Sequence, residues 1–454
     1  MKQAKITLFV SLLFICNTSQ AQIWVTVGSP GFSAGTTDYD CIAINGSGIP
    51  YVAYQDLANS SKATVMTYVD SNWIPVGTPA FSTSGADYVN MALDNSGTPY
   101  VVYEDIGDSL KATVMKYNGS DWVTVGNAGF SAGVVNYTTI AIDGSGTPYV
   151  VYKDLSNGSK ATVMKYNGTA WVGVDNPGFS AAAANATSIA IDPGGTPYVV
   201  YQDVGNGSKA TVMSFNGTSW GNVGAAGLSA GIAKNTSIAI DKSGTPYVAY
   251  VDVDYASTAT VMQFNGTIWA AMGGAGFSPN TVSYISLALA GVDSPYVVFS
   301  DGGSTDKATV MAYSGGSWGN VCNTDFSAGE AINTWIAIDG NGVPYVVYED
   351  VTNAGKATVM TPGQSSLVKN MGNPIVATLS VSPNPNQGTF TLLLSSKANE
   401  PARVTITNIL GEKIKECLIP TNNEAMIQLD AAPGIYFLTA VTDESIQNTK
   451  VVVR

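Results

Sequence analysis

The sequence has no histidine, and only four cysteines and 12% charged residues among its 454 positions. Without histidine, the chain lacks the side chain that most often acts as a general base or as a neutral metal ligand. Cys41, Cys322 and Cys417 lie beyond the N-terminal segment, and their spacing matches neither a disulfide framework nor a zinc site. We therefore expect no metal and no cofactor.

Long hydrophobic runs are also scarce. One largely apolar stretch, residues 6–16, follows Lys2 and Lys5, and it is too short to span a bilayer stably. This pattern predicts a signal peptide over residues 1–21, cleaved between Ala21 and Gln22, and no transmembrane segment. A lipoprotein signal ending at Cys16 is the alternative, although Ile15 occupies the position where such signals usually have a small residue.

Positive charge is in short supply, and the net charge is −13. Nucleic acids and anionic membranes require a cationic surface, so neither is an expected partner. With 45% hydrophobic residues and 48 glycines, the composition excludes disorder and favours an all-β protein with many turns.

A repeat of 49 residues dominates the chain. Pro-Tyr and Ala-Thr-Val-Met recur at this step without insertion or deletion, from residue 50 to residue 360. Tryptophan occurs at the same step, at positions 24, 73, 122, 171, 220, 269 and 318. Regular periods of this length indicate a solenoid or a propeller.

Each repeat contains four strand-like segments, as in residues 140–142, 149–152, 161–166 and 171–174. Four short strands repeated seven times predict a seven-bladed β-propeller over residues 22–362. The first tryptophan segment, residues 23–27, has no preceding partner, and the last repeat lacks its own tryptophan strand. We expect the N-terminal strand to complete the last blade and close the ring.

The segment Asp143–Val150, Asp-Gly-Ser-Gly-Thr-Pro-Tyr-Val, resembles the strand–turn–strand element of NHL-type propeller repeats. The spacing from Tyr166 through Asn167-Gly168 to Trp171 is similar to that of kelch repeats. Both resemblances imply the fold and no particular activity.

The register stops after Pro362, and we predict a linker over residues 363–376 and a small β domain over residues 377–454. Its motifs contain Pro383, Asn384, Pro385 and Gly388, then Gly411, and finally Gly434 and Tyr436. In order and spacing they resemble the type A C-terminal sorting domain of the type IX secretion system of Bacteroidota. The resemblance implies an Ig-like β-sandwich recognised by the secretion machinery, usually removed on export, and a protein released or attached to the outer surface. A simple Ig-like binding module is the alternative.

Seven aspartates follow the second strand of the repeats, and a lysine stands six residues later in six of them. This spacing predicts cross-strand ion pairs, with a ring of carboxylates for Ca²⁺ or a cationic ligand as the alternative. In that alternative the seven aspartates are the candidates for ligand binding: Asp56, Asp105, Asp154, Asp203, Asp252, Asp301 and Asp350. The aromatic series also suggests sugar binding, although recurrence in every blade favours packing.

Variation between the repeats is concentrated after each aspartate and before each innermost strand. Strand alternation places these segments on one face of the disc, which we predict to be the interaction surface. Every polar landmark recurs sevenfold, so we expect a protein that is not an enzyme and binds glycans or proteins at the cell surface. The alternatives are a structural envelope or matrix component, or a carboxylate-dependent polysaccharide hydrolase or lyase using acids such as Glu104 or Glu349.

Overall fold

The computed structural model describes residues 23–292, 294–363, 379–394, 401–408, 412–429, 431–441 and 446–454. Contacts divide the chain into two compact units, residues 1–365 and 366–454. The expected signal peptide with Ala21 and Gln22, and positions 364–376 of the expected linker, lie outside the described residues. Over the described ranges, no helix has the length and hydropathy needed to cross a membrane.

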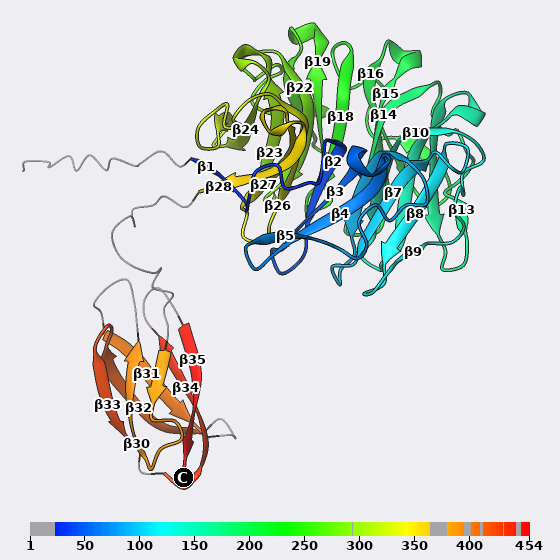
Figure 1. The fold of residues 1–454 in the computed structure, drawn as a ribbon. Coiled ribbons are helices and arrows are strands. Elements are labelled where there is room, and N and C mark those ends of the chain that lie inside the picture. The colour runs from blue at the N-terminus through cyan, green and yellow to red at the C-terminus, as the bar shows by residue number, and fades with distance from the viewer. Residues whose placement is uncertain are drawn as a thin grey trace, which may run out of the picture. The chain divides into compact units, whose positions relative to one another are not determined.

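The first unit is a ring of seven four-stranded antiparallel sheets, or blades (Figure 1). The strands of blades 1–3 are β2(Thr37–Ile44), β3(Pro50–Asp56), β4(Lys62–Val69), β5(Asn72–Pro75); β6(Ala86–Leu93), β7(Pro99–Asp105), β8(Lys111–Tyr117), β9(Trp122–Thr124); β10(Val135–Ile142), β11(Pro148–Asp154), β12(Lys160–Tyr166), β13(Trp171–Gly173). Those of blades 4 and 5 are β14(Ala184–Ile191), β15(Pro197–Asp203), β16(Lys209–Phe215), β17(Trp220–Asn222); β18(Ala233–Ile240), β19(Pro246–Asp252), β20(Thr258–Phe264), β21(Trp269–Ala271). Those of blades 6 and 7 are β22(Val282–Leu289), β23(Pro295–Asp301), β24(Lys307–Ser314), β25(Ser317–Asn320); β26(Ala331–Ile338), β27(Pro344–Asp350), β28(Lys356–Pro362), β1(Trp24–Thr26).

Short 3₁₀ turns follow the second strand in six blades. They are η1(Leu57–Asn59), η2(Leu155–Asn157), η3(Val204–Asn206), η4(Val253–Tyr255), η5(Gly302–Ser304) and η6(Val351–Asn353).

The hairpin between the first two strands of a blade is set by local chemistry. In blade 3, Asp143 Oδ1 accepts hydrogen bonds of 2.9 Å from the backbone N–H groups of both Ser145 and Thr147. Gly146 has φ +86°, a conformation that a residue with a side chain rarely adopts. The Asp-x-x-Gly motif therefore closes this turn and fixes the register of Ile142 opposite Pro148.

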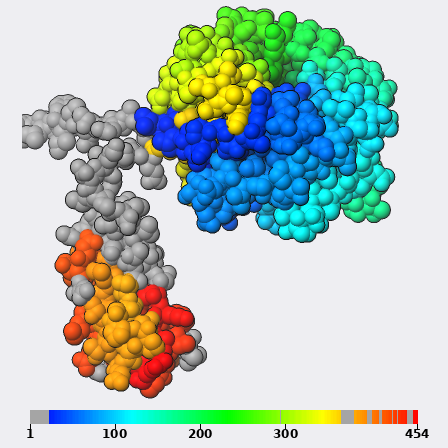
Figure 2. Space-filling view, in the orientation of Figure 1, coloured from blue at the N-terminus to red at the C-terminus, as the bar shows by residue number. Residues whose placement is uncertain are grey.

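The ring closes with strands from both ends of the propeller, as the unpartnered first strand predicts. β1 pairs antiparallel with β28, and Val25 lies opposite Thr361. In the space-filling view, the dark blue residues of the first strand lie against the yellow residues of the last repeat (Figure 2). With β1, the last blade has four strands like the other six.

The core lies between successive blades. Val150 and Tyr152 of blade 3 pack with Val102 and Val114 of blade 2, and all four are at most 1% exposed. Burial of such a side chain stabilises the fold by about 1.5–3 kcal/mol. Because every blade presents the same apolar residues to both neighbours, the stability of each blade depends on the next one round the ring.

The second unit consists of two sheets around one core. Its strands are β29(Leu379–Ser382), β30(Thr389–Leu394), β31(Pro401–Thr407), β32(Lys413–Pro420), β33(Glu424–Gln428), β34(Gly434–Val441) and β35(Ile446–Val453). The sheet orders are β29-β30-β33 and β32-β31-β34-β35. Leu392 of one sheet and Val404, Leu438 and Val451 of the other are fully buried in the shared core.

Candidate functional site

The two faces of the propeller differ in what they carry. Thr37 pairs with Asp56, and Asp56 with Lys62, so the aspartates and variable loops lie together at one end of the blades. We call this end the loop face. The Asp-x-x-Gly and Asn-Gly turns lie at the opposite end, which we call the turn face.

The seven aspartates of the loop face are buried, with 0–4% exposure. In six blades, the Oδ2 atom accepts a hydrogen bond of 2.9–3.2 Å from the hydroxyl group of the threonine eight residues later. In blade 6, Asp301 instead accepts from Asn280 Nδ2 at 2.9 Å and from the backbone of Gly303. These bonds hold the loop after the second strand against the third strand.

The predicted ion pairs with the following lysines are wrong. Across the described residues, the ion pairs are Arg403–Glu416 and Lys413–Glu416, both in the second unit. The aspartates are buried in the strands and take hydroxyl and amide donors, while the lysines remain partly exposed. Nor do three acidic or cysteine side chains of the described residues come close enough together to hold a metal ion.

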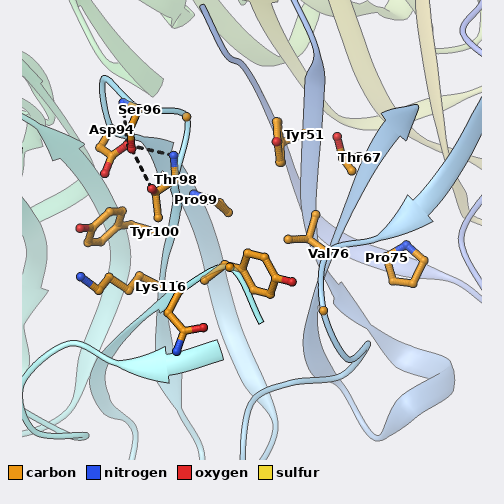
Figure 3. A pocket seen from close by; sticks show the side chains of 15 residues that line it. Tyr51, Thr67, Pro75, Val76, Asp94, Ser96, Thr98, Pro99, Tyr100 and Lys116 are labelled. Atoms are coloured by element: carbon orange, nitrogen blue, oxygen red, sulfur yellow. Dashed lines mark hydrogen bonds between the residues drawn. The ribbon is translucent and has the colours of Figure 1, made fainter. Parts of the chain in front are cut away.

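Three open cavities recur between neighbouring blades on the turn face. They have volumes of about 630 Å³ between blades 1 and 2, about 590 Å³ between blades 2 and 3, and about 410 Å³ between blades 3 and 4. We call them the inter-blade pockets. In the first, Tyr51 and Val76 of blade 1 lie across from Tyr100 and Lys116 of blade 2 (Figure 3).

An ammonium group lies over an aromatic ring in these pockets. Lys116 Nζ is 5.6 Å from the ring centroid of Tyr100, and Lys165 Nζ is 5.9 Å from that of Tyr149. Both distances are within the range of a cation–π interaction. The tyrosine recurs in all seven blades, whereas the lysine is present in blades 2 and 3 alone. All three inter-blade pockets therefore contain an ammonium group beside a tyrosine ring, whereas the corresponding positions of the other blades supply no lysine.

The turn that lines the first pocket carries an ionised acid. Burial raises the pKa of Asp94, but hydrogen bonds from Ser96 and Thr98 outweigh it and lower the pKa below its ordinary value. Ser96 Oγ donates to Asp94 Oδ1 at 2.6 Å (Figure 3). The pocket thus offers an aromatic ring, hydroxyl groups, an ammonium group and a carboxylate. Such a combination suits a polar ligand with an apolar face.

A separate cavity of about 250 Å³ lies at the loop-face end of the innermost strands, and we call it the axial pocket. Tyr39, Tyr88, Tyr137 and Tyr284 line it together with Trp335. Each tyrosine occupies the bulge of its innermost strand and has a φ of +50° to +53°. Bulges redirect side chains, and here the equivalent bulge of several blades contributes to one cavity.

Acidic residues of blades 7, 1 and 2 gather beside this pocket. Asp38 Oδ1 accepts a hydrogen bond of 2.7 Å from Asn333 Nδ2, Gln55 donates to Asp87, and Asn136 Nδ2 donates to Glu104 Oε2 at 3.0 Å. Equivalent positions in blades 3–6 carry no acid. The cluster is therefore confined to one side of the ring.

Burial is the main cause of the altered acidity of this cluster. It raises the pKa of Glu104 to about 7, helped by the charge of Asp87, and that of Glu349 to about 7, helped by Asp38 and Glu330. It also raises the pKa of the buried Asp40 well above its usual range and that of Tyr39 above the ordinary tyrosine value.

The sequence analysis singles out Glu104 and Glu349, but it does not show that they belong to one acidic cluster. They belong to repeats far apart in sequence, and only ring closure places blade 7 next to blade 1. The signal that reveals the cluster is positional. Acids occupy the repeat positions of Asp38 and Glu104 in consecutive blades of the closed ring.

The motifs of the second unit hold its last strand in place. Asn384 Nδ2 donates to the carbonyl of Lys450, and the N–H of Val452 donates to Asn384 Oδ1, both at 2.8 Å. Asn384 is flanked by Pro383 and Pro385, and both peptide bonds into these prolines are cis.

The glycine and tyrosine positions also have local roles. Gly388 has φ +88°, and an added Cβ would lie 2.9 Å from the carbonyl oxygen of Leu429. Gly434 begins β34, and the Tyr436 hydroxyl donates to the carbonyl of Ala432 at 2.6 Å. Gly411 lies outside the described residues.

Residues 380–454 match the family described as the secretion system C-terminal sorting domain. This match indicates that the protein is exported and is secreted or attached to the cell surface. Curated proteins yield no significant match to the chain.

The propeller resembles several solved structures at low sequence identity. An ulvan lyase of polysaccharide lyase family PL25, bound to -[GlcA(1-4)Rha3S]-, has 13% identity and a TM-score of 0.49, covering 75% of this chain and 96% of its own. A protein of unknown function from Dyadobacter fermentans has 9% identity and a TM-score of 0.45, with 76% and 99% covered. The Aleuria aurantia lectin in complex with Fucalpha1-6GlcNAc has 18% identity and a TM-score of 0.44, with 66% and 100% covered.

The expectation that the protein is not an enzyme is overturned by this comparison. It rested on the regularity of the repeats, and a polysaccharide lyase is among the propellers that the chain resembles. The acids beside the axial pocket, Asp38, Asp87, Glu104 and Glu349, also show that the ring is less regular than its recurring motifs suggest. These acids occupy repeat positions whose residue type differs from blade to blade. Repetition of structural residues does not exclude an irregular site built from the others.

Proposed function

We propose that this protein is an exported carbohydrate-binding propeller with NHL- or kelch-type repeats, displayed at the cell surface or secreted by a member of the Bacteroidota. Sugars occupy the inter-blade pockets of the turn face. The second unit is an Ig-like sorting domain that engages the type IX secretion machinery and leads the propeller across the outer membrane.

The recurrence of one pocket chemistry between successive blades carries this proposal. The rings of Tyr51 and Tyr100 line the first pocket, with the Lys116 ammonium group and the hydroxyl groups of Ser96 and Thr98 around them. An aromatic ring takes up the C–H face of a sugar, and the polar groups bind its hydroxyl groups. Several weak sites on one rigid ring bind a polymeric glycan with much higher avidity than one site alone.

The test is a glycan array probed with the purified protein. Ser96 is exposed and lines the first pocket, so Ser96→Trp fills that pocket without disturbing the core. Ser47→Trp is the matched control, because Ser47 holds the same repeat position in blade 1 and lines none of the three pockets. We expect S96W to weaken glycan binding and S47W to leave it unchanged. Absence of binding to any glycan would instead favour a structural component of the envelope or matrix.

A second candidate function is polysaccharide cleavage at the axial pocket. A carboxyl group whose pKa is near 7 is suited to general acid–base catalysis at neutral pH, and Glu104 and Glu349 both have this property. Incubation with a panel of polysaccharides tests it. Release of oligosaccharides that is abolished by Glu104→Gln or Glu349→Gln would support catalysis, and intact polysaccharides throughout would exclude these substrates.

A further inference from the structure

The axial pocket has walls unlike those of the inter-blade pockets. The rings of Tyr39 and Tyr88 are 5.0 Å apart, and those of Tyr88 and Tyr137 are 5.2 Å apart, in tilted arrangements. Tyr284 and Trp335 line the cavity as well. Its volume of about 250 Å³ equals roughly eight waters at ~30 Å³ each. One monosaccharide fits in such a space.

Four acids of blades 7, 1 and 2 lie beside this pocket: Glu349, Asp38, Asp87 and Glu104. The hydrogen-bond donors to Asp38, Asp87 and Glu104 are neutral amide groups. Among the described residues of the propeller, no lysine or arginine forms an ion pair with these acids or with Glu349. Acids of one sign beside a partly enclosed cavity concentrate the field there and favour a cation over an anion.

Asp40 supplies an independent indication of a ligand. It lines the axial pocket and is 2% exposed, and its Oδ2 accepts a hydrogen bond of 2.9 Å from Thr37. Its Oδ1 has no hydrogen-bond partner. In four other blades this position is a threonine whose hydroxyl donates to the neighbouring bulge carbonyl: Thr138, Thr187, Thr236 and Thr334. Four blades therefore have a hydroxyl group that forms its hydrogen bond at this position, whereas blade 1 has a carboxyl oxygen, Asp40 Oδ1, that receives none.

The rim of the pocket already shows how an ammonium group lies on these rings. Lys153 Nζ is 5.9 Å from the ring centroid of Tyr137 and donates to Asn185 Oδ1 at 2.8 Å. The Tyr39 and Tyr88 rings, on the acidic side, have no such cation among the described residues.

We propose that the axial pocket binds a sugar that carries a free primary ammonium group. The tyrosine rings take up the apolar face of the sugar and attract the cation, and the carboxylates of blades 7, 1 and 2 neutralise it. Its N–H groups supply the donor that Asp40 Oδ1 lacks. The choice of a sugar rests on the proposed carbohydrate-binding function, whereas the preference for an ammonium group follows from this pocket alone.

Calorimetric titration of the purified protein at pH 8 with 6-amino-6-deoxyglucose and with glucose tests the proposal. The two sugars have nearly the same size and differ in one charge. We expect glucose to bind about tenfold more weakly, or not measurably, because it lacks the cation–π and carboxylate interactions. Equal affinity for both sugars, or binding of neither, would overturn the proposal.

Variants locate the binding. Tyr88→Leu removes the ring and should weaken binding of the amino sugar about fivefold, whereas Tyr88→Phe keeps it and should not. Glu104→Gln should weaken binding, while Asp121→Asn, an equal loss of charge at an exposed turn of the same blade, should not. Affinity unchanged in Y88L and E104Q, or reduced equally in D121N, would place the ligand elsewhere and overturn the proposal.

These results are separable from the test of the inter-blade pockets. S96W alters the turn face and should leave amino-sugar binding intact. If glycan-array binding fails while the amino sugar still binds, the proposal for the inter-blade pockets is wrong. If the amino sugar does not bind while array binding is normal and sensitive to S96W, the proposal for the axial pocket is wrong.

Discussion

The indole Nε1 of Trp24 donates a hydrogen bond of 2.9 Å to the carbonyl oxygen of Val321, 297 positions later in the chain. The six other repeat tryptophans make the same bond, of 2.7–2.9 Å, to the residue 46 positions earlier. Trp24 also stacks on Phe326 with ring centroids 4.2 Å apart. The junction between the chain ends of the propeller is therefore built with the same contacts as every other junction between blades.

Trp24→Phe should destabilise the propeller by about 0.5–1.5 kcal/mol, because the partly buried carbonyl of Val321 loses its donor. Urea unfolding measures the free energy. Trp73→Phe is the matched control, since it removes the same bond, to Val27, within the continuous chain. A much smaller loss for W24F than for W73F would show that the junction is not essential for a closed ring.

Leu228→Phe should stabilise the protein. In six blades a phenylalanine stacks on the tryptophan of the neighbouring blade with centroids 3.9–4.2 Å apart. Leu228 takes this position beside Trp269. Restoring the stacked pair should add about 0.5–1.5 kcal/mol.

Thermal and urea unfolding measure this gain. The reverse substitution, Phe277→Leu, removes the stacking on Trp318 and should cost a similar amount. A lower melting temperature for L228F would mean that the leucine site is too small for the ring.

The free energy of unfolding should decrease as the pH rises from about 4.5 through about 7. Burial raises the folded-state pKa of Glu104 and Glu349 to about 7, so both bind protons more tightly when folded. Their contribution is fully present below the unfolded pKa and is lost as the pH rises through 7. The groups around them, Asp38, Asp87 and Glu330, are acidic and act in the same direction.

Urea titrations between pH 4.5 and pH 8.5 check this dependence. The double variant Glu104→Gln/Glu349→Gln should flatten the profile and be more stable than the parent at pH 8. A profile that is already flat in the parent protein would contradict the assignment of these raised pKa values.

Asn384→Ala should loosen the last strand of the second unit and reduce export. The variant loses both hydrogen bonds between the Asn384 side chain and the backbone of Lys450 and Val452. Immunodetection in cell and culture-medium fractions measures export. Lys450→Ala in the same strand is the control, because it changes an exposed side chain and keeps the backbone carbonyl that Asn384 contacts. Equal export of N384A and the parent would show that the strand is held without the Asn384 side chain.

The period of 49 residues was sufficient to predict four-stranded blades, the hairpin turns and the use of the first strand in the last blade. These features depend on local chemistry, such as the positive φ of Gly146 and the donors that Asp143 accepts from Ser145 and Thr147. The predicted aspartate–lysine ion pairs failed because spacing along a hairpin does not reveal burial. The carboxylate of Asp154 is 1% exposed and takes the hydroxyl of Thr162 instead of a lysine.

By itself, the sequence determined the repeat, the all-β class, the number of blades and the sorting motifs, because each follows from residues close together in the chain. Tertiary structure alone decided which unequal residues meet. Glu349 and Asp38 are neighbours because the ring closes, and four tyrosines from separate repeats share one cavity because each innermost strand bulges toward it. A periodic sequence therefore predicts the scaffold, whereas a binding site arises from departures from the period that only the closed ring brings together.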